Sequence, residues 1–220
     1  MKRALPFIVV LTVAAITVGS GLFLYQKKRP ANAAPITAKT EPDAPGQIVH
    51  TLGPENAPVT LEEFGDFQCP PCGHLSEPIN QLQKQYSLRV IYRNFPLAIH
   101  AHAKEAAYAA EAAGKQGKFW QMHDLLFREQ AVWSKSPDPR ALFNAYAGML
   151  LLDLNRFKKD MDGPEVQQQV DLDQRRGTGI GVKTTPTVFL NNEAIPPTQV
   201  NPNDLPAMVE AAMKKAKPSS

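Results

Sequence analysis

The sequence has very little cysteine: Cys69 and Cys72 are the only two in 220 residues. With no further cysteine, the folding of the protein does not depend on a framework of disulfides. A single bridge across two intervening residues would close a very small loop and remove little chain entropy, so it would stabilise the fold poorly. A zinc knuckle would need a second cysteine pair beside Cys69, Cys72 and His74, and none exists. A structural disulfide and a metal site remain the weaker alternatives for this pair.

Other patterns are missing as well. The sequence has no internal repeat, and it lacks the basic stripe or aromatic–basic pattern that indicates nucleic-acid binding. Removing five N-terminal positive charges from the net charge of +3 leaves −2 for residues 31–220. These charges belong to Lys2, Arg3, Lys27, Lys28 and Arg29. The content of 43% hydrophobic and 20% charged residues is ordinary for one globular domain with a sizeable core.

An apolar segment lies within residues 1–29. Residues 4–25 carry no charge and would measure about 33 Å as a helix, which is long enough to cross a bilayer. A cleavage site of the A-x-A type follows at 31–33, but the basic residues 27–29 lie between it and the apolar segment. The sequence therefore favours an uncleaved transmembrane anchor, with a signal cleaved near Ala33 as the alternative. The basic residues on both sides leave the orientation open.

The two cysteines lie where a strand is expected to give way to a helix. Residues 59–64 are apolar and β-branched, which predicts a strand. Residues 70–86 predict a helix with Pro70 and Pro71 at its first positions, where no N–H is needed. Cys69 is therefore expected at a helix N-terminus, where the helix dipole and unpaired N–H groups lower the pKa of a thiol. This setting predicts a redox-active dithiol.

The rest of the chain predicts an α/β fold. Alternation at 88–93 indicates a second strand, and about eighty residues of helical pattern separate it from a strand at 187–190. Helices are expected at 101–113, 119–127, 139–149, 164–176 and 205–217, and a turn at 191–192 leads to a short strand at 194–195. The order is a βαβ unit and a ββα unit with a helical insertion at about 100–176. We expect this domain to span 47–217, after a Pro- and Ala-rich tether at 30–46 whose composition continues to residue 58.

Several motifs in these segments resemble those of one known family. In the order of that family they are Glu63-Phe64, Cys69-Pro70-Pro71-Cys72, Asn94-Phe95-Pro96-Leu97, Gly117-Lys118-Phe119-Trp120 with His123-Asp124, and Thr185-Pro186-Thr187. Over residues 50–216 the sequence resembles the DsbA-like thiol:disulfide oxidoreductases, in particular their secreted or membrane-tethered branch. The resemblance implies a thioredoxin-like fold with an inserted α-helical subdomain. The sequence departs from the family at Pro70-Pro71, where Pro-His or Pro-Tyr is common, which leaves the redox potential and the direction of the reaction open.

The resemblance also implies roles for individual residues. Cys69 would be the solvent-facing nucleophile and Cys72 the buried resolving thiol, and the pair would react through a mixed disulfide. Thr185 and Pro186 would form a cis-proline loop opposite the cysteines, where the backbone of Thr185 can pair with an extended substrate. Pro70 and Pro71 would tune the redox potential. The redox group would be the cysteine pair itself, with no organic cofactor and no metal.

Two adjacent glutamates receive different expectations. Glu63 lies six residues before Cys69 and matches the buried acid of the family. On a covered strand its pKa would rise, which would let Glu63 carry the proton of Cys72. The alternative for Glu63 is a solvated carboxylate at the end of a strand, and we expect that role for Glu62.

Three histidines lie near the motifs. His100 and His102 precede the Ala-rich helix, and we expect them to pack or cap because no carboxylate or cysteine spacing accompanies them. His74 follows Cys72 by two residues and points away from Cys69 on a helix, so tuning of the thiol by His74 is the lesser alternative.

The function expected from these features is an extracytoplasmic thiol:disulfide oxidoreductase that forms or exchanges disulfides in exported proteins. The resemblance implies unfolded or reduced exported proteins as substrates, and re-oxidation by a quinone-linked membrane partner of the DsbB or vitamin-K-epoxide-reductase type. The expected location is the cytoplasmic membrane, spanned once by residues 4–25, with the catalytic domain facing the periplasm or exterior. Periplasmic or secreted protein after cleavage is the alternative. A membrane-tethered thiol reductase and, less favoured, a metal-binding module are the rival functions.

Overall fold

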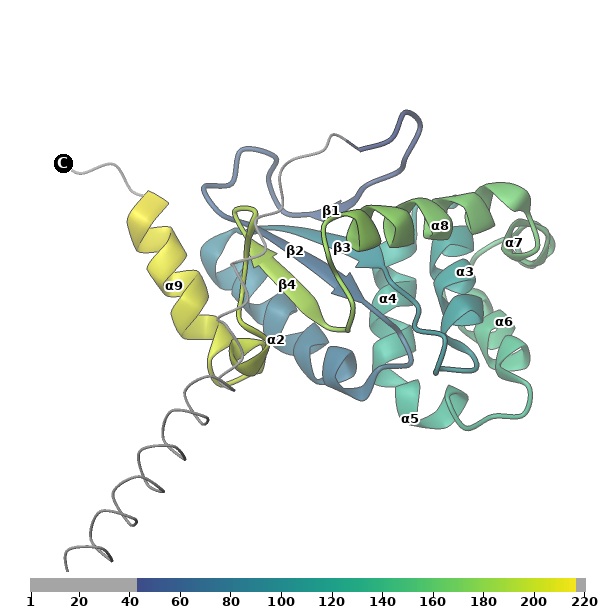
Figure 1. The fold of residues 1–220 in the computed structure, drawn as a ribbon. Helices are drawn as coiled ribbons and strands as arrows, with labels where there is room; N and C mark the ends of the chain where they lie inside the picture. Colours follow the sequence, from purple (N-terminus) through teal and green to yellow (C-terminus); the bar gives the residue numbers. More distant parts are fainter. Residues whose placement is uncertain (1–42, 217–220) are drawn as a thin grey trace, which may run out of the picture. The chain divides into compact units, whose positions relative to one another are not determined.

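The structure is a computed structural model that describes residues 43–216. Within these residues a mixed sheet of five strands has the order β1-β3-β2-β4-β5 (Figure 1). The strands are β1 (His50–Leu52), β2 (Thr60–Gly65), β3 (Arg89–Asn94), β4 (Thr187–Leu190) and β5 (Glu193–Ala194). β2 and β3 run parallel, and the other neighbours run antiparallel. The carboxyl ends of β2 and β3 therefore meet at one edge of the sheet, where their loops can interact.

The described residues also contain eight α-helices. α2 (Pro70–Tyr86) connects β2 to β3, and α9 (Leu205–Ala216) follows β5 after a 3-10 turn at Pro197–Gln199. The other six helices lie between β3 and β4. They are α3 (Ala103–Gly114), α4 (Phe119–Arg128), α5 (Gln130–Trp133), α6 (Pro139–Met149), α7 (Leu154–Met161) and α8 (Pro164–Gly179). The expected thioredoxin-like fold, a βαβ unit and a ββα unit with a helical insertion, is confirmed.

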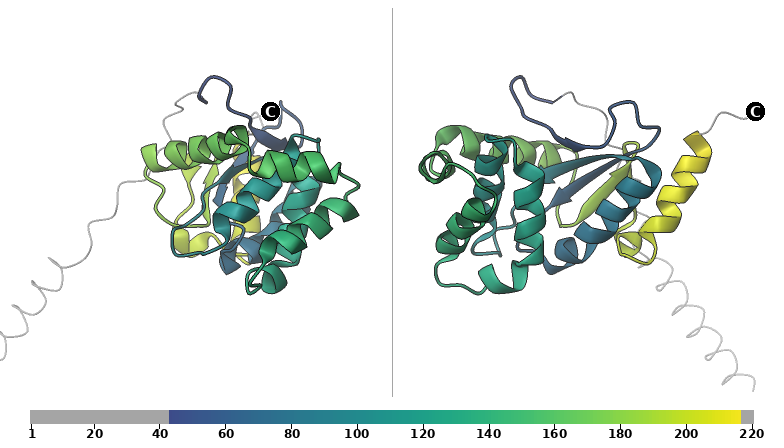
Figure 2. Two further views of the ribbon diagram at one scale, coloured as in Figure 1. Left: turned by 90° about the vertical axis from the view of Figure 1, so that its right-hand side faces the viewer. Right: turned by 180° about the vertical axis from the view of Figure 1, so that it is seen from behind.

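The helix α2 lies between the insertion and the C-terminal helix. It contacts α4 on one side and α9 on the other. In Figure 1, α9 lies at the side of the sheet away from α3, α6 and α7, and the view from behind in Figure 2 agrees. Within the insertion, α3 contacts α4, α6, α7 and α8. The first turn of α2 is therefore shaped by the insertion as well as by the sheet.

The ends of several helices follow from local sequence. α2 begins with two prolines and ends at Ser87, whose φ of 51° is left-handed. The carboxylate of Asp138 caps α6 by accepting from Ala141 N at 3.2 Å. Asp153 caps α7 in the same way and accepts from the backbone N–H groups of Asn155 and Arg156. Such caps satisfy the backbone donors that a helix start leaves unpaired.

Buried side chains form three clusters around the sheet. One fills the space between β2, β4, α2 and α9. A second is built on the alanines of α3 and includes Cys72 and Tyr92, so the core of the insertion extends to the cysteine pair. The third lies on the other side of β2 and β4 and consists of Phe64, Phe95, Val182 and Phe189. Gly177 of α8 packs closely here, because a Cβ at this position would lie 2.8 Å from the ring of Phe95.

The structure differs from expectation near its first described residues. β1 forms at His50–Leu52, inside the Pro-rich stretch expected to be extended up to residue 58. The side chain of Asp43 pairs with Arg93 of β3, so the ordered body begins before the expected boundary at residue 47. No helix within residues 43–216 has the length and apolarity to cross a bilayer. The anchor expected at 4–25, the possible cleavage at 31–33 and most of the tether lie outside the described residues.

Candidate active site

The cysteine pair lies at the start of α2, as the local sequence predicts. Cys69 is the N-cap residue, and the exposed Pro70 and Pro71 form the first turn before Cys72. Both sulfurs are free thiols in the structure. Cys72 is 0% exposed and Cys69 is only 5% exposed. Cys72 is therefore fully covered, and Cys69, which was expected to face solvent, is also buried apart from a small exposed fraction.

The loop before β4 lies against Cys69. The peptide bond between Thr185 and Pro186 is cis. The thiol of Cys69 donates to the carbonyl oxygen of Thr185 at 3.4 Å, although 116 residues separate the two in sequence. Both Thr185 and Pro186 are half-buried. The bent loop that leads into β4 at Thr187 therefore lies directly beside the sulfur of Cys69.

The surroundings of Cys69 favour its thiolate. A hydrogen bond from Cys72 is the largest influence, and it lowers the pKa of Cys69 to about 6. Burial and the negative charge of Asp66 act in the opposite direction but do not outweigh it. The thiolate is the nucleophile in disulfide exchange, and a pKa of about 6 favours this form of Cys69 at neutral pH.

Cys72 and Glu63 have the opposite tendency. Burial, the hydrogen bond to Cys69 and the charge of Glu63 raise the pKa of Cys72 well above its ordinary value. Glu63 is 3% exposed, and burial, helped by the negative charge of Cys69, raises its pKa to about 8. Its Oε1 atom has no hydrogen-bond partner among the described residues. A carboxyl group that is protonated at neutral pH beside a buried thiol can exchange a proton with it.

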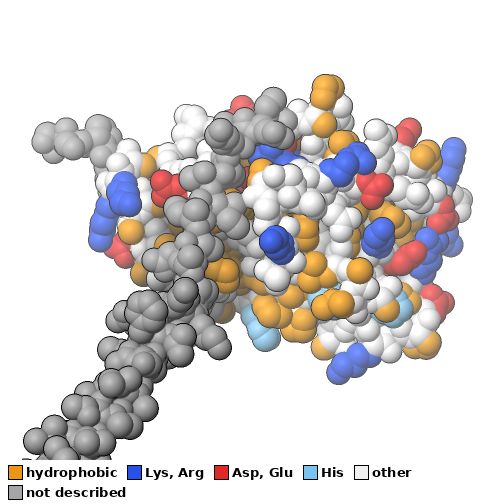
Figure 3. All heavy atoms as spheres, in the orientation of Figure 1, with side chains coloured by type: hydrophobic (Ala, Val, Ile, Leu, Met, Phe, Trp, Pro, Cys, Tyr) orange, Lys and Arg blue, Asp and Glu red, His pale blue; other side chains and the backbone are white. Residues whose placement is uncertain are grey.

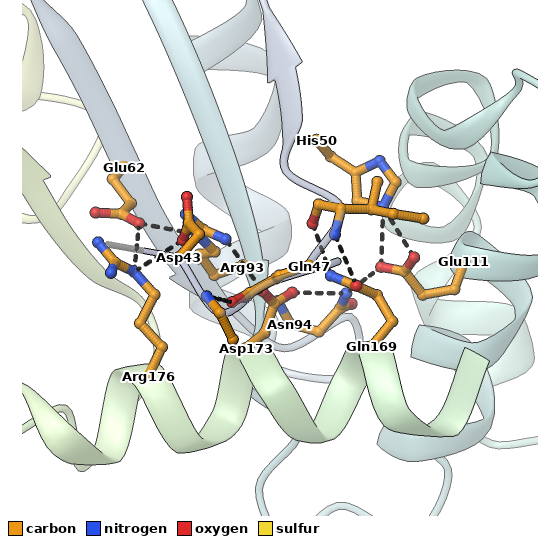
Figure 4. A network of polar contacts seen from close by, with 12 residues as sticks. Asp43, Gln47, His50, Glu62, Arg93, Asn94, Glu111, Gln169, Asp173 and Arg176 are labelled. Carbon is orange, nitrogen blue, oxygen red and sulfur yellow. Dashed lines mark hydrogen bonds and ion pairs between the residues drawn. The ribbon is translucent and has the colours of Figure 1, made fainter. Parts of the chain in front are cut away.

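Glu62 does not have the exposed position that the sequence predicts. It was expected to be a solvated carboxylate, but it is buried on the opposite face of β2 from Glu63. Its Oε1 accepts from Arg93 Nε at 2.9 Å and from Arg176 Nε at 3.3 Å (Figure 4). Arg93 itself is 1% exposed and also pairs with Asp43 at 2.6 Å. The pleat of the strand therefore sends one glutamate towards the cysteines and the other into a buried ion-pair network.

This network continues to α8 and α3. Asp173 of α8 accepts from the backbone N–H of Asn94 at 3.0 Å and from the side chain of Gln47 at 2.8 Å. Burial raises the pKa of Asp173 to about 6, although Arg93 opposes the shift. Figure 4 shows that the network joins the segment before β1 to the sheet and to α8. It lies on the face of β2 away from Glu63 and has a structural role.

Gln130 of α5 holds the cysteine loop and was not found from the sequence. Its Nε2 donates to the carbonyl oxygens of Phe67 and Cys69 at 2.7 and 2.9 Å. Gly73 allows this approach, because a Cβ there would lie 3.0 Å from Gln130 Oε1. A lone glutamine more than 55 residues after the motif gives no signal of this contact in the sequence.

The histidines differ from expectation in one respect. His74 is exposed. His100 does meet a carboxylate, since its Nδ1 lies 2.7 Å from Oδ2 of Asp66, so the view that none accompanies it was wrong. The partners are 34 residues apart in sequence and meet only because the β2 and β3 loops share an edge. In the part of the chain that the structure describes, no group of three or more side chains is arranged to hold a metal ion.

Comparisons with known proteins agree with this geometry. The family model described as thioredoxin matches residues 45–211. The structure is similar to oxidised BdbD from Bacillus subtilis, with a TM-score of 0.65, 25% identity and coverage of 74% of this chain and 92% of that chain. It is also similar to the thiol-disulfide exchange protein α-DsbA2 from Wolbachia pipientis, with a TM-score of 0.65, 18% identity and coverage of 76% and 87%.

Curated relatives include a Na(+)/H(+) antiporter, NhaA 1, from Salinispora arenicola, which is 40% identical over 144 residues. That match covers 64% of this chain but only 21% of the antiporter, so the chain spans about a fifth of the length of this relative. The fold, the match to the family model over most of the chain and the similarity to BdbD all agree. The chain therefore belongs to the thioredoxin family and has the DsbA-like form of its fold, in which a block of helices is inserted between the two halves of the thioredoxin unit.

Proposed function

We propose that this protein is a thiol:disulfide oxidoreductase that acts on other proteins through Cys69 and Cys72. The observation that carries the proposal is the asymmetry of the pair. One thiol has a pKa of about 6 and donates to the Thr185 carbonyl, and the other is fully buried, with a pKa that burial and the charge of Glu63 raise. In a pair of this kind the first sulfur forms the mixed disulfide with the substrate, and the second sulfur makes or breaks the bond within the pair.

The reaction begins with the oxidised pair. A substrate thiolate attacks Sγ of Cys69, the Cys69–Cys72 bond breaks, and the sulfur of Cys72 leaves and takes a proton, for which Glu63 is the donor. A second substrate thiolate attacks the substrate sulfur of the mixed disulfide, and Cys69 leaves as a thiolate. The substrate gains a disulfide, and its two electrons reside on the reduced pair. Pro70 and Pro71 add no ionisable group between the cysteines, so the thiolate depends on the hydrogen bond from Cys72 and on the helix start.

Protein substrates fit the surface around the pair. In Figure 3, hydrophobic side chains gather on the face where α2 begins, with histidines among them. Ile99, on the loop after β3 that meets the cysteine loop, is among the most exposed large apolar side chains in the described residues. Unfolded or reduced proteins expose apolar segments that can lie on such a surface while the Thr185 backbone pairs with them.

We further propose that the domain acts outside the cytoplasm and is tethered to the membrane by residues 4–25. The apolar length of that segment supports this location, and so does the occurrence of a similar sequence in antiporters, which are membrane proteins. An oxidising dithiol is useful where glutathione and thioredoxin do not keep thiols reduced. Continued turnover then needs a partner that removes two electrons, and a quinone-linked membrane oxidoreductase of the DsbB or vitamin-K-epoxide-reductase type supplies that chemistry.

Trapping tests the roles of the two cysteines. Cys72→Ser should accumulate mixed disulfides between Cys69 and substrate proteins, because Cys72 can no longer attack Sγ of Cys69 and release the bound substrate. Cys69→Ser should abolish oxidation of a reduced model protein and should trap nothing. Mixed disulfides that form equally well in Cys69→Ser would refute the assignment.

The reduction potential separates the oxidase from its rival. A potential well above the value of about −270 mV for thioredoxin, measured against glutathione, supports oxidation of substrates. A potential at or below that value would make a membrane-tethered reductase the better account.

A membrane-impermeant maleimide applied to intact cells after mild reduction tests the location. Labelling that occurs only after lysis would place the domain in the cytoplasm.

A further inference from the structure

The loop between β2 and α2 is held by Asp66, a buried carboxylate that the exchange reaction does not use. Asp66 is 1% exposed. Its Oδ1 accepts from Gln68 N at 2.7 Å, and its Oδ2 accepts from Leu97 N at 2.8 Å. Its carbonyl oxygen accepts from Cys69 N at 3.0 Å. Asp66 therefore fixes the backbone that leads into the reactive cysteine and ties it to the loop after β3.

The charge of this carboxylate is unfavourable for the chemistry beside it. Its negative charge raises the pKa of Cys69, while the hydrogen bond from Cys72 lowers that pKa. A buried carboxylate is retained in a fold only when hydrogen bonds or an opposite charge compensate it. The loop thus requires a group whose charge disfavours the thiolate three residues away.

His100 is the group that can offset this charge. Its Nδ1 lies 2.7 Å from Asp66 Oδ2, and because a carboxylate only accepts, the ring nitrogen is the donor. Among the described residues whose hydrogen bonds reach the Asp66 carboxylate, His100 is the only one able to carry a positive charge. Its side chain is 19% exposed, so solvent reaches the ring.

The loop that carries His100 is attached to the cysteine loop at a second point. The backbone N–H of His102 donates to Oε1 of Gln68 at 2.7 Å. A turn with His100 N donating to Leu97 O at 3.0 Å gives the loop a fixed shape. The ring of His100 is therefore held in place from both sides of the contact.

We propose that His100 is a positioning residue for Cys69: it holds the Asp66 carboxylate against the loop after β3 and, as the imidazolium, balances its negative charge beside the reactive sulfur. This inference rests on the proposed function, because it assigns a residue that tunes the same thiol. The titratable groups that act on Cys69 are Cys72, Asp66 and Glu63. Among these, Asp66 is paired with a histidine.

The test compares two asparagine substitutions in the full, reduced chain. His100→Asn keeps an N–H donor for Asp66 but never carries a charge, and His102→Asn is the matched control on the same loop. The ultraviolet absorbance of the thiolate and the rate of alkylation of Cys69 are followed from about pH 4.5 to 8, the range in which a histidine gains and loses its proton. We expect His100→Asn to alkylate about threefold more slowly than the parent near pH 5.5, through an upward shift of the Cys69 titration. His102→Asn should match the parent.

A double variant keeps the proposal testable if loop stability also changes. Asp66→Asn should shift the Cys69 titration downward, and adding His100→Asn should then change nothing further. Superimposable titrations of His100→Asn and parent would overturn the proposal, as would an effect of His100→Asn that persists in the Asp66→Asn background. The titration reads Cys69 directly and needs no substrate. A failure to oxidise any protein would therefore refute the proposed function and leave this result standing.

Discussion

The two sulfur atoms of the pair meet very different surroundings within one helical turn. Cys69 lies at the N-cap position of α2 and its thiol donates to the carbonyl oxygen of Thr185, whereas Cys72 is completely buried in the core cluster that reaches both cysteines. A hydrogen bond from the second thiol stabilises the thiolate of the first, and burial keeps the second neutral. The chemical difference between the cysteines is therefore a property of their positions on the helix.

Alkylation of the reduced protein should report this difference directly. Because the pKa of Cys69 is about 6, its rate of reaction with iodoacetamide should rise to half its maximum near that pH and level off above about pH 7. Cys72 should stay unmodified over the same time, as measured by mass spectrometry of the digested protein. Equal labelling of both thiols at neutral pH would contradict the assignment.

Glu63→Gln should stabilise the folded protein at neutral pH. The pKa of Glu63 is raised from 4.5 to about 8, so unfolding releases a proton between these values. The free energy of unfolding of the parent therefore falls as the pH rises from about 4.5 to 8. A glutamine does not ionise, so the gain over the parent should be on the order of 3 kcal/mol near pH 7 and should vanish near pH 4, as measured by denaturant unfolding.

The neighbouring residue supplies a control of opposite sign. Glu62→Gln removes the charge that pairs with Arg93, and it should lower stability by about 1–3 kcal/mol. The same substitution on two adjacent residues thus separates the two faces of β2. A gain for Glu63→Gln that does not depend on pH would show that its carboxyl group is not held neutral.

On the scale of elements, the short helix α5 acts as a clamp on the cysteine loop. Gln130→Ala removes two hydrogen bonds to the carbonyl oxygens of Phe67 and Cys69. We expect a loss of about 1–3 kcal/mol in stability and disulfide exchange that is several-fold slower, because the loop is no longer held in one geometry. Gln121→Ala, at an exposed position on α4, is the control and should change neither. Unchanged exchange kinetics in Gln130→Ala would show that Gln130 does not hold the cysteine loop in its reactive geometry.

The elements with strong local signals were predictable from the sequence. The expected helix at 70–86 has the bounds of α2, because its prolines and apolar periodicity are local. β1 was missed because three residues among prolines and glycines carry no periodic pattern. Alternation along β2 places Glu62 and Glu63 on opposite faces of the sheet. The burial of Glu62 could not be predicted in this way, because its partner Arg176 lies 114 residues later in the sequence. The position of the cysteine pair was predictable for the same local reason as α2, whereas the contact of Asp66 with His100 depends on the tertiary fold.

On the scale of the whole described domain, one buried arginine joins parts that are distant in sequence. Arg93 pairs with Asp43, Glu62 and Asp173, which lie before β1, on β2 and on α8. Arg93→Met should lower the free energy of unfolding by about 3–5 kcal/mol, because three carboxylates lose their shared cation. Denaturant unfolding followed by circular dichroism measures the change.

A surface arginine provides the comparison. Arg128 pairs with Glu129 at 3.1 Å, and both side chains are exposed. Arg128→Met should cost less than about 1 kcal/mol, because solvent screens this pair. If both arginine variants lost the same stability, the buried network would not be what joins these segments.

The ties of the segment before β1 have a mechanical consequence. Asp43 is bound to Arg93, Gln47 to Asp173, and the backbone of Ile48 both donates to and accepts from the side chain of Gln169. Tension on the chain ahead of Asp43 would be taken up first by these contacts with β3 and α8. β2 and the first turn of α2 lie behind them in the path of the force. A pull from that end should therefore leave the spacing of Cys69, Cys72 and the Thr185 loop unchanged until the ties at Asp43, Gln47 and Ile48 have broken.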